Sequence, residues 1–298
     1  MMKSEIHMHS IYSDGEFSPQ KLVEIARKNS VSVLSLTDHD TFEGIEEFIE
    51  ASRLAGIEGF PGIEITVSYR DFQLHVLAYF RAQEDIKPEL ALRVKEMADA
   101  RVQRMRELID RVNDLIPDRF KGTIEFDNVR KAAEGVLARP HLAREMVRLK
   151  IVSSTRDAFD RYLAPYNVLR KNIDIKDALR LIRESGGIPV LAHPGERAYS
   201  LYCPTKGREY EDVPPMVEEL ASWGLMGLEC VYPYHEKIRK VEYYKDLARQ
   251  FGLIITGSRD FHGFSTGQSA KVLGGTRMDC KFYHEFKRVW SASQASVG

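Results

Sequence analysis

Short apolar segments alternate with amphipathic helical patterns in two separate stretches of this 298-residue chain. Val31 to Leu36 is an apolar run that we predict to be a buried strand, between a helix starting at Ser18-Pro19 and another from Glu43 to Ala55. Strands joined by helices form parallel sheets, so the alternation predicts an α/β fold. The other predicted strands are 63–67, 73–77, 188–192, 225–231 and 253–256, and the later predicted helices are 178–184, 217–223 and 235–251.

Residues 83–163 follow a different pattern, because helical periodicity continues there without a convincing strand. We therefore predict a helical insertion domain (83–163) between the two parts, 1–82 and 164–298, of a discontinuous α/β domain. Its first helix, Pro88 to Leu115, is highly charged. We interpret its arginines as a solvated helix face, since such charges usually pair with neighbours along the helix; they are Arg93, Arg101, Arg104, Arg106 and Arg111.

Composition excludes several classes of protein. The formal net charge is -1, which argues against a protein that coats nucleic acid with its whole surface. The three cysteines, Cys203, Cys230 and Cys280, lie far apart and are odd in number, so we expect no disulfide framework and a cytoplasmic location. The N-terminus has no apolar signal region, and no run approaches the about 20 apolar residues that span a bilayer. We therefore expect no membrane association.

Histidines are the most informative residues, and five of the nine follow a predicted strand at or near its C-terminal end. That end carries the active site in parallel α/β barrels. In His7-Met8-His9 the two imidazoles of an extended segment point to one face, which suits a divalent metal. Asp260-Phe261-His262 presents a carboxylate and an imidazole in the same way. Each pair alone is modest support for a metal site.

Further ligand-competent side chains end or interrupt the other predicted strands. They are Asp14 in a turn, His39 between Asp38 and Asp40, Glu64 and His75 within apolar runs, and His193 before Pro194. Each has an ordinary structural interpretation, such as a turn-forming aspartate or a satisfied core histidine. Asp38 and Asp40 are placed either to orient the ring of His39 or to raise its basicity. Unpaired buried charges are costly, so the whole set together predicts a shared cluster of cations.

The order of these motifs resembles the PHP family, named for its polymerase and histidinol-phosphatase members. The matching segments are His7-Met8-His9, Ser13-Asp14-Gly15, Thr37-Asp38-His39-Asp40, Gly62-Ile63-Glu64, His75-Val76-Leu77, Ala192-His193-Pro194 and Asp260-Phe261-His262-Gly263. The resemblance implies a distorted (β/α)7 barrel with a small helical insertion. Within the family the chain looks like the branch of nucleotide phosphatases, RNA 5′-end exonucleases and cyclic-phosphate diesterases, through Arg139-Pro140-His141-Leu142-Ala143, residues 158–163 and Gly227-Leu228-Glu229 leading to His235.

The resemblance also implies the metal ligands. One metal would be held by His7, His9, Glu64 and Asp260, a second by Asp14, His39 and His262, and a third by Glu64, His75 and His193. Oxygen and imidazole ligands suit manganese, iron or zinc, and the sequence does not choose between them or between two and three ions. Glu5 and Arg259 depart from the family pattern, which usually has aspartate and serine there.

The implied chemistry is hydrolysis of a phosphate ester by a hydroxide that the metals generate. Asp14, His39, His235 and Arg139 are the candidate catalytic residues. The candidates for binding the phosphate are Arg139, His141, His235 and Arg259, and which of them protonates the leaving group is left open. The expected substrate is a small phosphorylated molecule, a nucleotide, a sugar phosphate or an RNA 5′ end. The alternatives are a cyclic-phosphate phosphodiesterase, a histidinol-phosphate phosphatase and a catalytically silent metal-binding module. The oligomeric state is also left open.

Overall fold

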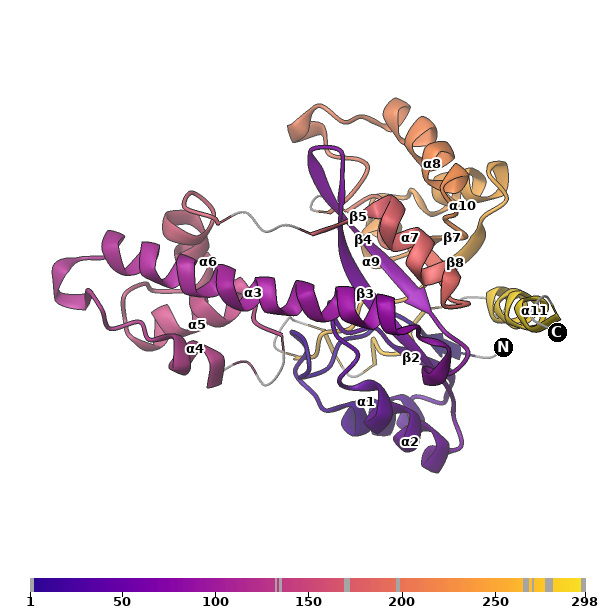
Figure 1. Cartoon of the computed structure of the whole chain (residues 1–298), viewed down its shortest axis with the longest axis horizontal. Helices are drawn as coiled ribbons and strands as arrows, with labels where there is room; N and C mark the ends of the chain where they lie inside the picture. Colours follow the sequence, from indigo (N-terminus) through magenta and orange to yellow (C-terminus); the bar gives the residue numbers. More distant parts are fainter. Residues whose placement is uncertain are drawn as a thin grey trace.

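A mixed β-sheet forms the centre of the protein in this computed structural model (Figure 1). The description covers residues 3–131, 133, 136–168, 172–196, 199–264, 268–269, 271–276 and 281–295. The strand order is β1-β2-β3-β4-β6-β7-β8, and β5 pairs with β3. The strands are β1 (Lys3–Glu5), β2 (Val31–Leu36), β3 (Glu58–Tyr69), β4 (Phe72–Tyr79), β5 (Ile173–Asp174), β6 (Ile188–Leu191), β7 (Gly227–Val231) and β8 (Ile254–Gly257). The predicted α/β fold is confirmed.

The strands are parallel except β4, which runs antiparallel to β3 and to β6. The expectation of a wholly parallel sheet is therefore wrong at β4. Only Arg70 and Asp71 separate β3 from β4, and a parallel connection needs a far longer crossover. Arg70 adopts a positive φ of 54°, which closes this tight hairpin.

The two edges of the sheet meet beyond the ends of β1 and β8. Met8 and Phe261 form an isolated parallel bridge, in which His9 N donates to Phe261 O at 2.9 Å and Phe261 N donates to His7 O at 3.1 Å. Side chains from β2, β3, β4, β6, β7 and β8 converge in one apolar cluster that also contains Phe286 and Trp290 of α11. The closure brings residues 7–9 next to residues 260–262.

Helices cover the outside of the sheet (Figure 1). Helices α1 (Pro19–Lys28) and α2 (Ile45–Ala55) pack on β2, and α2 also contacts β3. As predicted, Ser18 caps α1, and its hydroxyl accepts from Lys21 N at 3.2 Å. The predicted helix 235–251 is interrupted at Arg239, whose φ is 57°. The remaining outer helices are α7 (Ile175–Glu184), α8 (Val213–Ser222), α9 (Pro233–Lys237), α10 (Val241–Gln250) and α11 (Lys281–Ala295).

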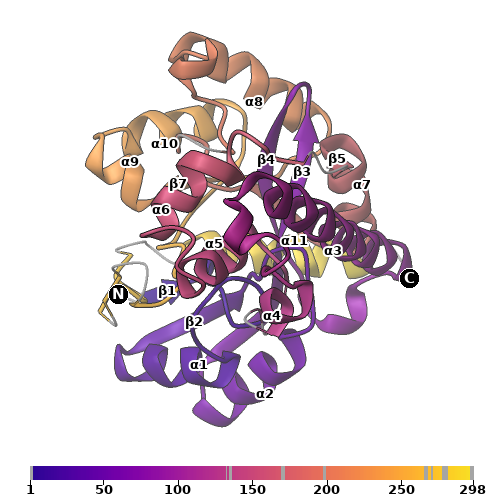
Figure 2. The ribbon, with the colours of Figure 1, turned by 90° about the vertical axis from the view of Figure 1, so that its left-hand side faces the viewer.

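The helical segment between β4 and β5 extends to one side of the sheet (Figures 1 and 2). It has an apolar cluster of its own, drawn from residues 102–168. Its long helix α3 joins this cluster to the sheet, because Leu90 and Met97 pack with the sheet whereas Leu108 and Val112 pack in the insertion. The domain division at residues 83–163 stays our proposal. The helices of the segment are α3 (Pro88–Leu115), α4 (Phe126–Lys131), α5 (Arg139–Arg148) and α6 (Thr155–Ala158), with a π-helical turn at Phe159–Leu163.

In the described part of the chain, no helix is both long enough and apolar enough to cross a membrane.

Candidate metal centre

The fold gathers all nine predicted metal ligands, Glu64 among them, into one cluster. They come from both ends and the middle of the sequence, since His7 and His9 follow β1, His39 follows β2, and Asp260 and His262 follow β8. Glu64 Oε2 lies 3.1 Å from His7 Nε2 and 3.2 Å from His9 Nε2. The same two nitrogens lie 3.2 and 3.1 Å from Asp260 Oδ1. These four side chains therefore face one point in space.

Asp14 forms the centre of a second group. Its carboxylate lies 3.3 Å from His262 Nε2, 3.7 Å from His9 Nδ1 and 3.9 Å from His39 Nε2. The ligand atoms of these four residues all lie within 4.8 Å of one another. Compared with the predicted set, the geometry adds His9, whose other nitrogen faces Glu64.

A third group surrounds the second oxygen of Glu64. Glu64 Oε1 is 2.8 Å from His75 Nδ1 and 3.2 Å from His193 Nε2, and Glu64 Oε2 is 3.2 Å from His39 Nδ1. Glu196, which the sequence reasoning did not select, joins His193 and Asp260 in a further group of ligand atoms. The hydroxyl of Tyr232 links two members of this further group, because it lies 3.0 Å from Glu196 Oε2 and 3.2 Å from Asp260 Oδ2.

These contacts fit cations better than they fit hydrogen bonds. Within the described residues, several buried polar atoms of the centre lack a hydrogen-bond partner although oppositely charged atoms lie close by; they are His9 Nε2, Asp14 Oδ1, His39 Nδ1, His75 Nδ1, His193 Nδ1 and Asp260 Oδ1. Buried polar groups in proteins are normally satisfied, because desolvation without a partner is costly. Imidazole nitrogens and carboxylate oxygens directed at a common point are the donor set of a divalent metal site.

Local backbone features aim the ligands. Asp14 lies in a turn closed by Ser13 N and Gly15 N, which both donate to Ser10 O at 3.0 Å. Gly15 is required there, because a Cβ at this position would lie 2.1 Å from His9 O. His193 and Asp260 have positive φ values of 26° and 51°, and such strained backbone is concentrated at functional sites.

Buried carboxylates hold this arrangement from behind. Glu229 accepts a hydrogen bond from His7 Nδ1 at 3.0 Å and another from His193 N at 2.8 Å. The first bond fixes the tautomer of His7 and leaves its Nε2 for a metal. Glu5 accepts from Ser258, from Arg259 N and from Gly274 N, and burial raises its pKa to about 7. Glu229 lay in a recognised motif, but nothing in the sequence pointed to its contact with His7.

Asp38 and Asp40, which flank His39 in sequence, have other partners in the structure. Asp38 instead accepts from Ser10 N at 2.7 Å and from Ser13 Oγ at 2.5 Å, and so holds the turn that carries Asp14. Asp40 accepts from Thr66 N at 2.7 Å and forms a buried ion pair with Arg101 of α3. Both aspartates are buried; hydrogen bonds from Ser10 and Ser13 satisfy Asp38, and Arg101 matches the charge of Asp40.

The charges of the centre depend strongly on one another. Burial alone would raise the pKa of Glu64, but the imidazoles of His39, His75 and His7 hold it well below its usual value. Burial alone would lower the pKa of His262, but the carboxylates of Asp14 and Asp260 raise it to about 10. Burial lowers the pKa of His39 to about 3. The neighbouring imidazoles likewise hold the pKa values of Asp14 and Asp260 well below their usual range, so these two carboxylates and that of Glu64 are ionised at neutral pH, which favours binding of cations.

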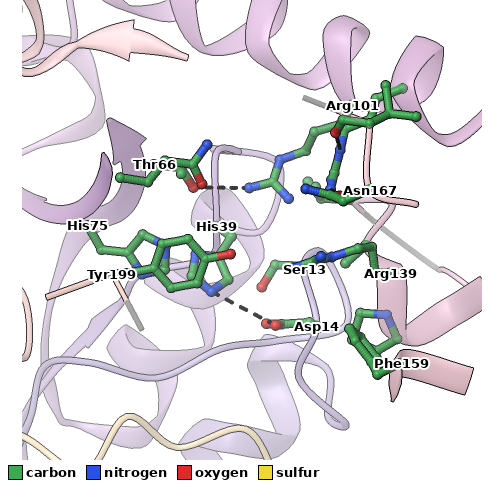
Figure 3. A pocket seen from close by; sticks show the side chains of 16 residues that line it. Ser13, Asp14, His39, Thr66, His75, Arg101, Arg139, Phe159, Asn167 and Tyr199 are labelled. Atoms are coloured by element: carbon green, nitrogen blue, oxygen red, sulfur yellow. Dashed lines mark hydrogen bonds and ion pairs between the residues drawn. The ribbon is translucent and has the colours of Figure 1, made fainter. Parts of the chain in front are cut away.

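A cavity of about 270 Å³ opens beside the centre (Figure 3). Asp14, His39 and His75 form one wall, and Tyr199 stacks on the ring of His75 with centroids 4.2 Å apart. The helical segment supplies the opposite wall, through Arg101, Arg104, Arg139, Phe159 and Asn167. The interpretation of Arg101 and Arg104 as a solvated helix face is therefore wrong.

The four predicted phosphate-binding residues lie in different surroundings. Arg139 lines the cavity. His141, two residues along α5, accepts from Ala138 N through Nδ1 at 3.0 Å. Burial and Arg144 lower the pKa of His141 to about 4, so the ring is neutral and carries its proton on Nε2.

His235 and Arg259 do not reach the cavity. Both ring nitrogens of His235 are bonded to the backbone, since Gly195 N donates to Nε2 at 3.0 Å and Nδ1 lies 3.0 Å from Cys230 O. The Arg259 guanidinium is bound to Glu236, with Nη1 2.6 Å from Oε2, and also donates to Gly275 O. We therefore remove both residues from the phosphate-binding set.

The comparisons with known proteins agree with this geometry. Residues 5–138 match the PHP domain. The chain is 30% identical over 264 residues to a 5′-3′ exoribonuclease of Haemophilus influenzae, an alignment that covers 87% of this chain and 90% of the relative. It is 27% identical over 283 residues to a 3′,5′-nucleoside bisphosphate phosphatase of Chromobacterium violaceum, covering 93% of this chain and 92% of the relative.

Among solved structures, one described as a metal-dependent phosphoesterase of Bifidobacterium adolescentis superposes with a TM-score of 0.78 at 25% identity, over 97% of this chain and 96% of that one. Fold, site and relatives define an α/β hydrolytic enzyme with a divalent metal centre at the ends of its strands. The chain belongs to the PHP family, as its motifs predicted, and it is a metal-dependent phosphoesterase. The catalytically silent alternative is thereby disfavoured.

Proposed function

We propose that this enzyme hydrolyses a phosphate ester of a nucleotide or of a short RNA 5′ end in the cavity between the strand ends and the helical segment. The observation that carries the proposal is the convergence of imidazoles and carboxylates around Glu64 at contact distances of about 3 Å, with several of these buried atoms lacking a hydrogen-bond partner among the described residues. The substrate class is supported by the two relatives, whose names refer to RNA and to nucleoside bisphosphates. The location that we propose, a reducing cytoplasm, is consistent with the unpaired Cys203 and Cys230.

The nine predicted ligands would hold two or three divalent cations, of manganese, iron or zinc. His7, His9, Glu64 and Asp260 would hold one, Asp14, His39 and His262 a second, and Glu64, His75 and His193 a third where three are bound. When bound, such cations lower the pKa of water to near neutrality and neutralise charge on the phosphate.

The protein's own residues would orient the substrate. Arg139 presents a planar donor fork to the cavity, which suits a phosphate. His141 would add a hydrogen bond from Nε2, since its Nδ1 is bound to Ala138 N. Asp14, His39 and Arg139 stay candidate catalytic residues because all three line the cavity, whereas His235, the fourth candidate, does not line it. Because the helical segment forms one wall of the cavity, it would limit the access of bulk water to the reacting phosphate.

A substrate panel with manganese-loaded protein tests the proposal. It contains adenosine 3′,5′-bisphosphate, a 5′-phosphorylated RNA oligonucleotide, a ribose cyclic phosphate and histidinol phosphate. We expect turnover of the bisphosphate or the RNA to exceed that of the other two. The variant Glu64→Gln should lose bound metal and activity together, whereas Glu50→Gln, exposed on α2, should lose neither. Faster turnover of the cyclic phosphate or of histidinol phosphate would refute the substrate class.

A further inference from the structure

The turn that follows β6 carries both a predicted metal ligand and a carboxylate that the proposed function does not use. Glu196 N donates to His193 O at 3.0 Å, so the chain reverses over residues 193–196 and brings the Glu196 side chain back beside the His193 ring. The turn is held from behind, because Gly195 N donates to His235 Nε2 at 3.0 Å and a Cβ on Gly195 would lie 2.8 Å from the same nitrogen. The positions of His193 and Glu196 are therefore set together.

The His193 ring is placed to bind a cation through one nitrogen and needs an acceptor at the other. Its Nε2 lies 3.2 Å from Glu64 Oε1, on the side of the metal centre. A neutral imidazole that ligates through Nε2 carries its proton on Nδ1. His193 is 3% exposed, and within the described residues its Nδ1 has no hydrogen-bond partner. Glu196 Oε2 lies 3.9 Å from this nitrogen, and a shift of about 1 Å would bring the two atoms to hydrogen-bond distance.

A tyrosine joins the same carboxylate to Asp260. Tyr232 directly follows β7 and is 7% exposed. Its hydroxyl lies 3.0 Å from Glu196 Oε2 and 3.2 Å from Asp260 Oδ2. A phenol has one proton to donate, so it cannot fully satisfy both carboxylates. If the Nδ1 proton of His193 is donated to Glu196, the proton of Tyr232 is left for Asp260, and each carboxylate has a donor.

We propose that Glu196 is a positioning residue that accepts the Nδ1 proton of His193 and thereby determines how tightly the third cation is held. This inference rests on the proposed function, in which His193 is a ligand of that cation. Glu229 has the equivalent relation to His7, whose Nδ1 lies 3.0 Å from Glu229 Oε1. A carboxylate behind a ligating histidine fixes its tautomer and orients its ring, which strengthens metal binding. Glu196 would therefore decide whether the centre holds two cations or three at a given metal concentration.

Stepwise manganese binding tests the inference, because it reports each cation separately and does not depend on turnover. Bound manganese is counted by atomic emission over a series of buffered free concentrations. The wild-type protein should bind all three cations, and Glu196→Gln should weaken the binding of one of them about tenfold and leave the others within about twofold. The loss is small for such a carboxylate because the Glu196 side chain is 40% exposed. Glu196→Asp, which keeps the charge on a shorter side chain, should recover part of the affinity.

The variant His75→Ala identifies the cation that is affected, because His75 belongs to the proposed ligands of the third cation alone. A double variant that combines Glu196→Gln with His75→Ala should bind manganese as His75→Ala does, since both changes act on the same cation. The matched control is Glu218→Gln, exposed on α8, which should bind manganese as the wild-type protein does. Circular dichroism confirms that each variant is folded.

A folded Glu196→Gln protein that binds manganese as tightly as the wild-type protein at every step would overturn the inference. So would a wild-type protein that binds only two cations at saturation. A further loss in the double variant would also overturn it, because Glu196 would then act on a different cation. These outcomes leave the proposed function intact, since hydrolysis of the substrate panel is measured separately. A wild-type protein that binds manganese and cleaves no nucleotide would instead refute the proposed function.

Discussion

Replacing Glu229 by glutamine tests how the metal centre is supported, because the change keeps the side chain's shape and removes its charge. Glu229 is 1% exposed, and its two oxygens accept from His7 Nδ1 at 3.0 Å and from His193 N at 2.8 Å. A glutamine offers one oxygen, so in either orientation its NH2 group faces one of these donors. A buried donor left unpaired costs about 1–3 kcal/mol.

The expected consequence falls on metal affinity. Loss of a carboxylate behind a ligating histidine typically weakens metal binding about 10- to 100-fold, which is about 1.4–2.7 kcal/mol and agrees with the cost of one unpaired donor. We therefore expect Glu229→Gln to raise the Kd for manganese by that factor, measured by competition with a fluorescent chelator. Saturating manganese should restore most of the activity, because Glu229 positions His7 and His193 and does not line the cavity.

The matched control is Glu242→Gln, on the surface of α10, where the carboxylate pairs with Lys245. Its Kd should stay within about twofold of the wild-type value, as expected for an exposed pair. A folded Glu229→Gln protein with wild-type manganese affinity would refute the reasoning, because it would mean that the tautomer of His7 is set by something other than this carboxylate.

Two further predictions concern stability. Arg101→Leu should lower the free energy of unfolding by about 3 kcal/mol, because it leaves the buried carboxylate of Asp40 without its charged partner. The control Arg93→Leu, at an exposed position, should change the free energy of unfolding by less than about 0.5 kcal/mol. Urea denaturation measures both values, and equal values would contradict the importance of the buried pair. Metal-free protein should lose stability as pH rises from about 6.5 to about 10. Burial alone would lower the pKa values of His193 and His262, but Glu64 raises the pKa of His193 to about 9 and Asp14 raises that of His262 to about 10. Their protonated rings therefore stabilise the fold at low pH, and this stabilisation is lost as the rings deprotonate. Manganese binds neutral imidazoles, so the Tm of the metal-loaded protein should rise with pH between about 6.5 and 9, opposite to the metal-free protein. Plots of Tm against pH that run parallel with and without chelator would refute this.

The cluster of imidazoles and carboxylates could be anticipated from the sequence because most of its members lie within a strand or just after one. Period-two spacing placed His7 and His9 on one face, and the ends of apolar runs located His39 and His193. Nothing in a strand pattern, however, specifies what lies behind a ligand. The contact of Glu229 with His7 joins residues 222 positions apart, and it depends on closure of the sheet.

The error on α3 had a different cause. The signal for Arg101 and Arg104 was present, since both lie on the helical stripe defined by Val94, Met97 and Leu108. The many charges along the helix suggested an exposed face, whereas the spacing of its apolar residues places the two arginines at buried positions. His235 shows the opposite limitation. Its sequence context suggested chemistry, but Gly195, about 40 residues away in sequence, approaches closely enough for its N–H to bind the ring.

The position of α3 explains how a mostly conventional metal centre could acquire its own substrate preference. The ligands are anchored on strand ends and are fixed by the closed sheet, so changes outside the sheet leave them in place. The facing wall belongs to one helix whose first half packs on the sheet and whose second half packs in the insertion. Arg101 is joined to the loop of His39 through Asp40, and Arg104 lies one turn further on. A helix packed along both of its halves therefore positions the wall that faces the metal centre, and substitutions along its inward stripe would alter substrate choice without disturbing the metals.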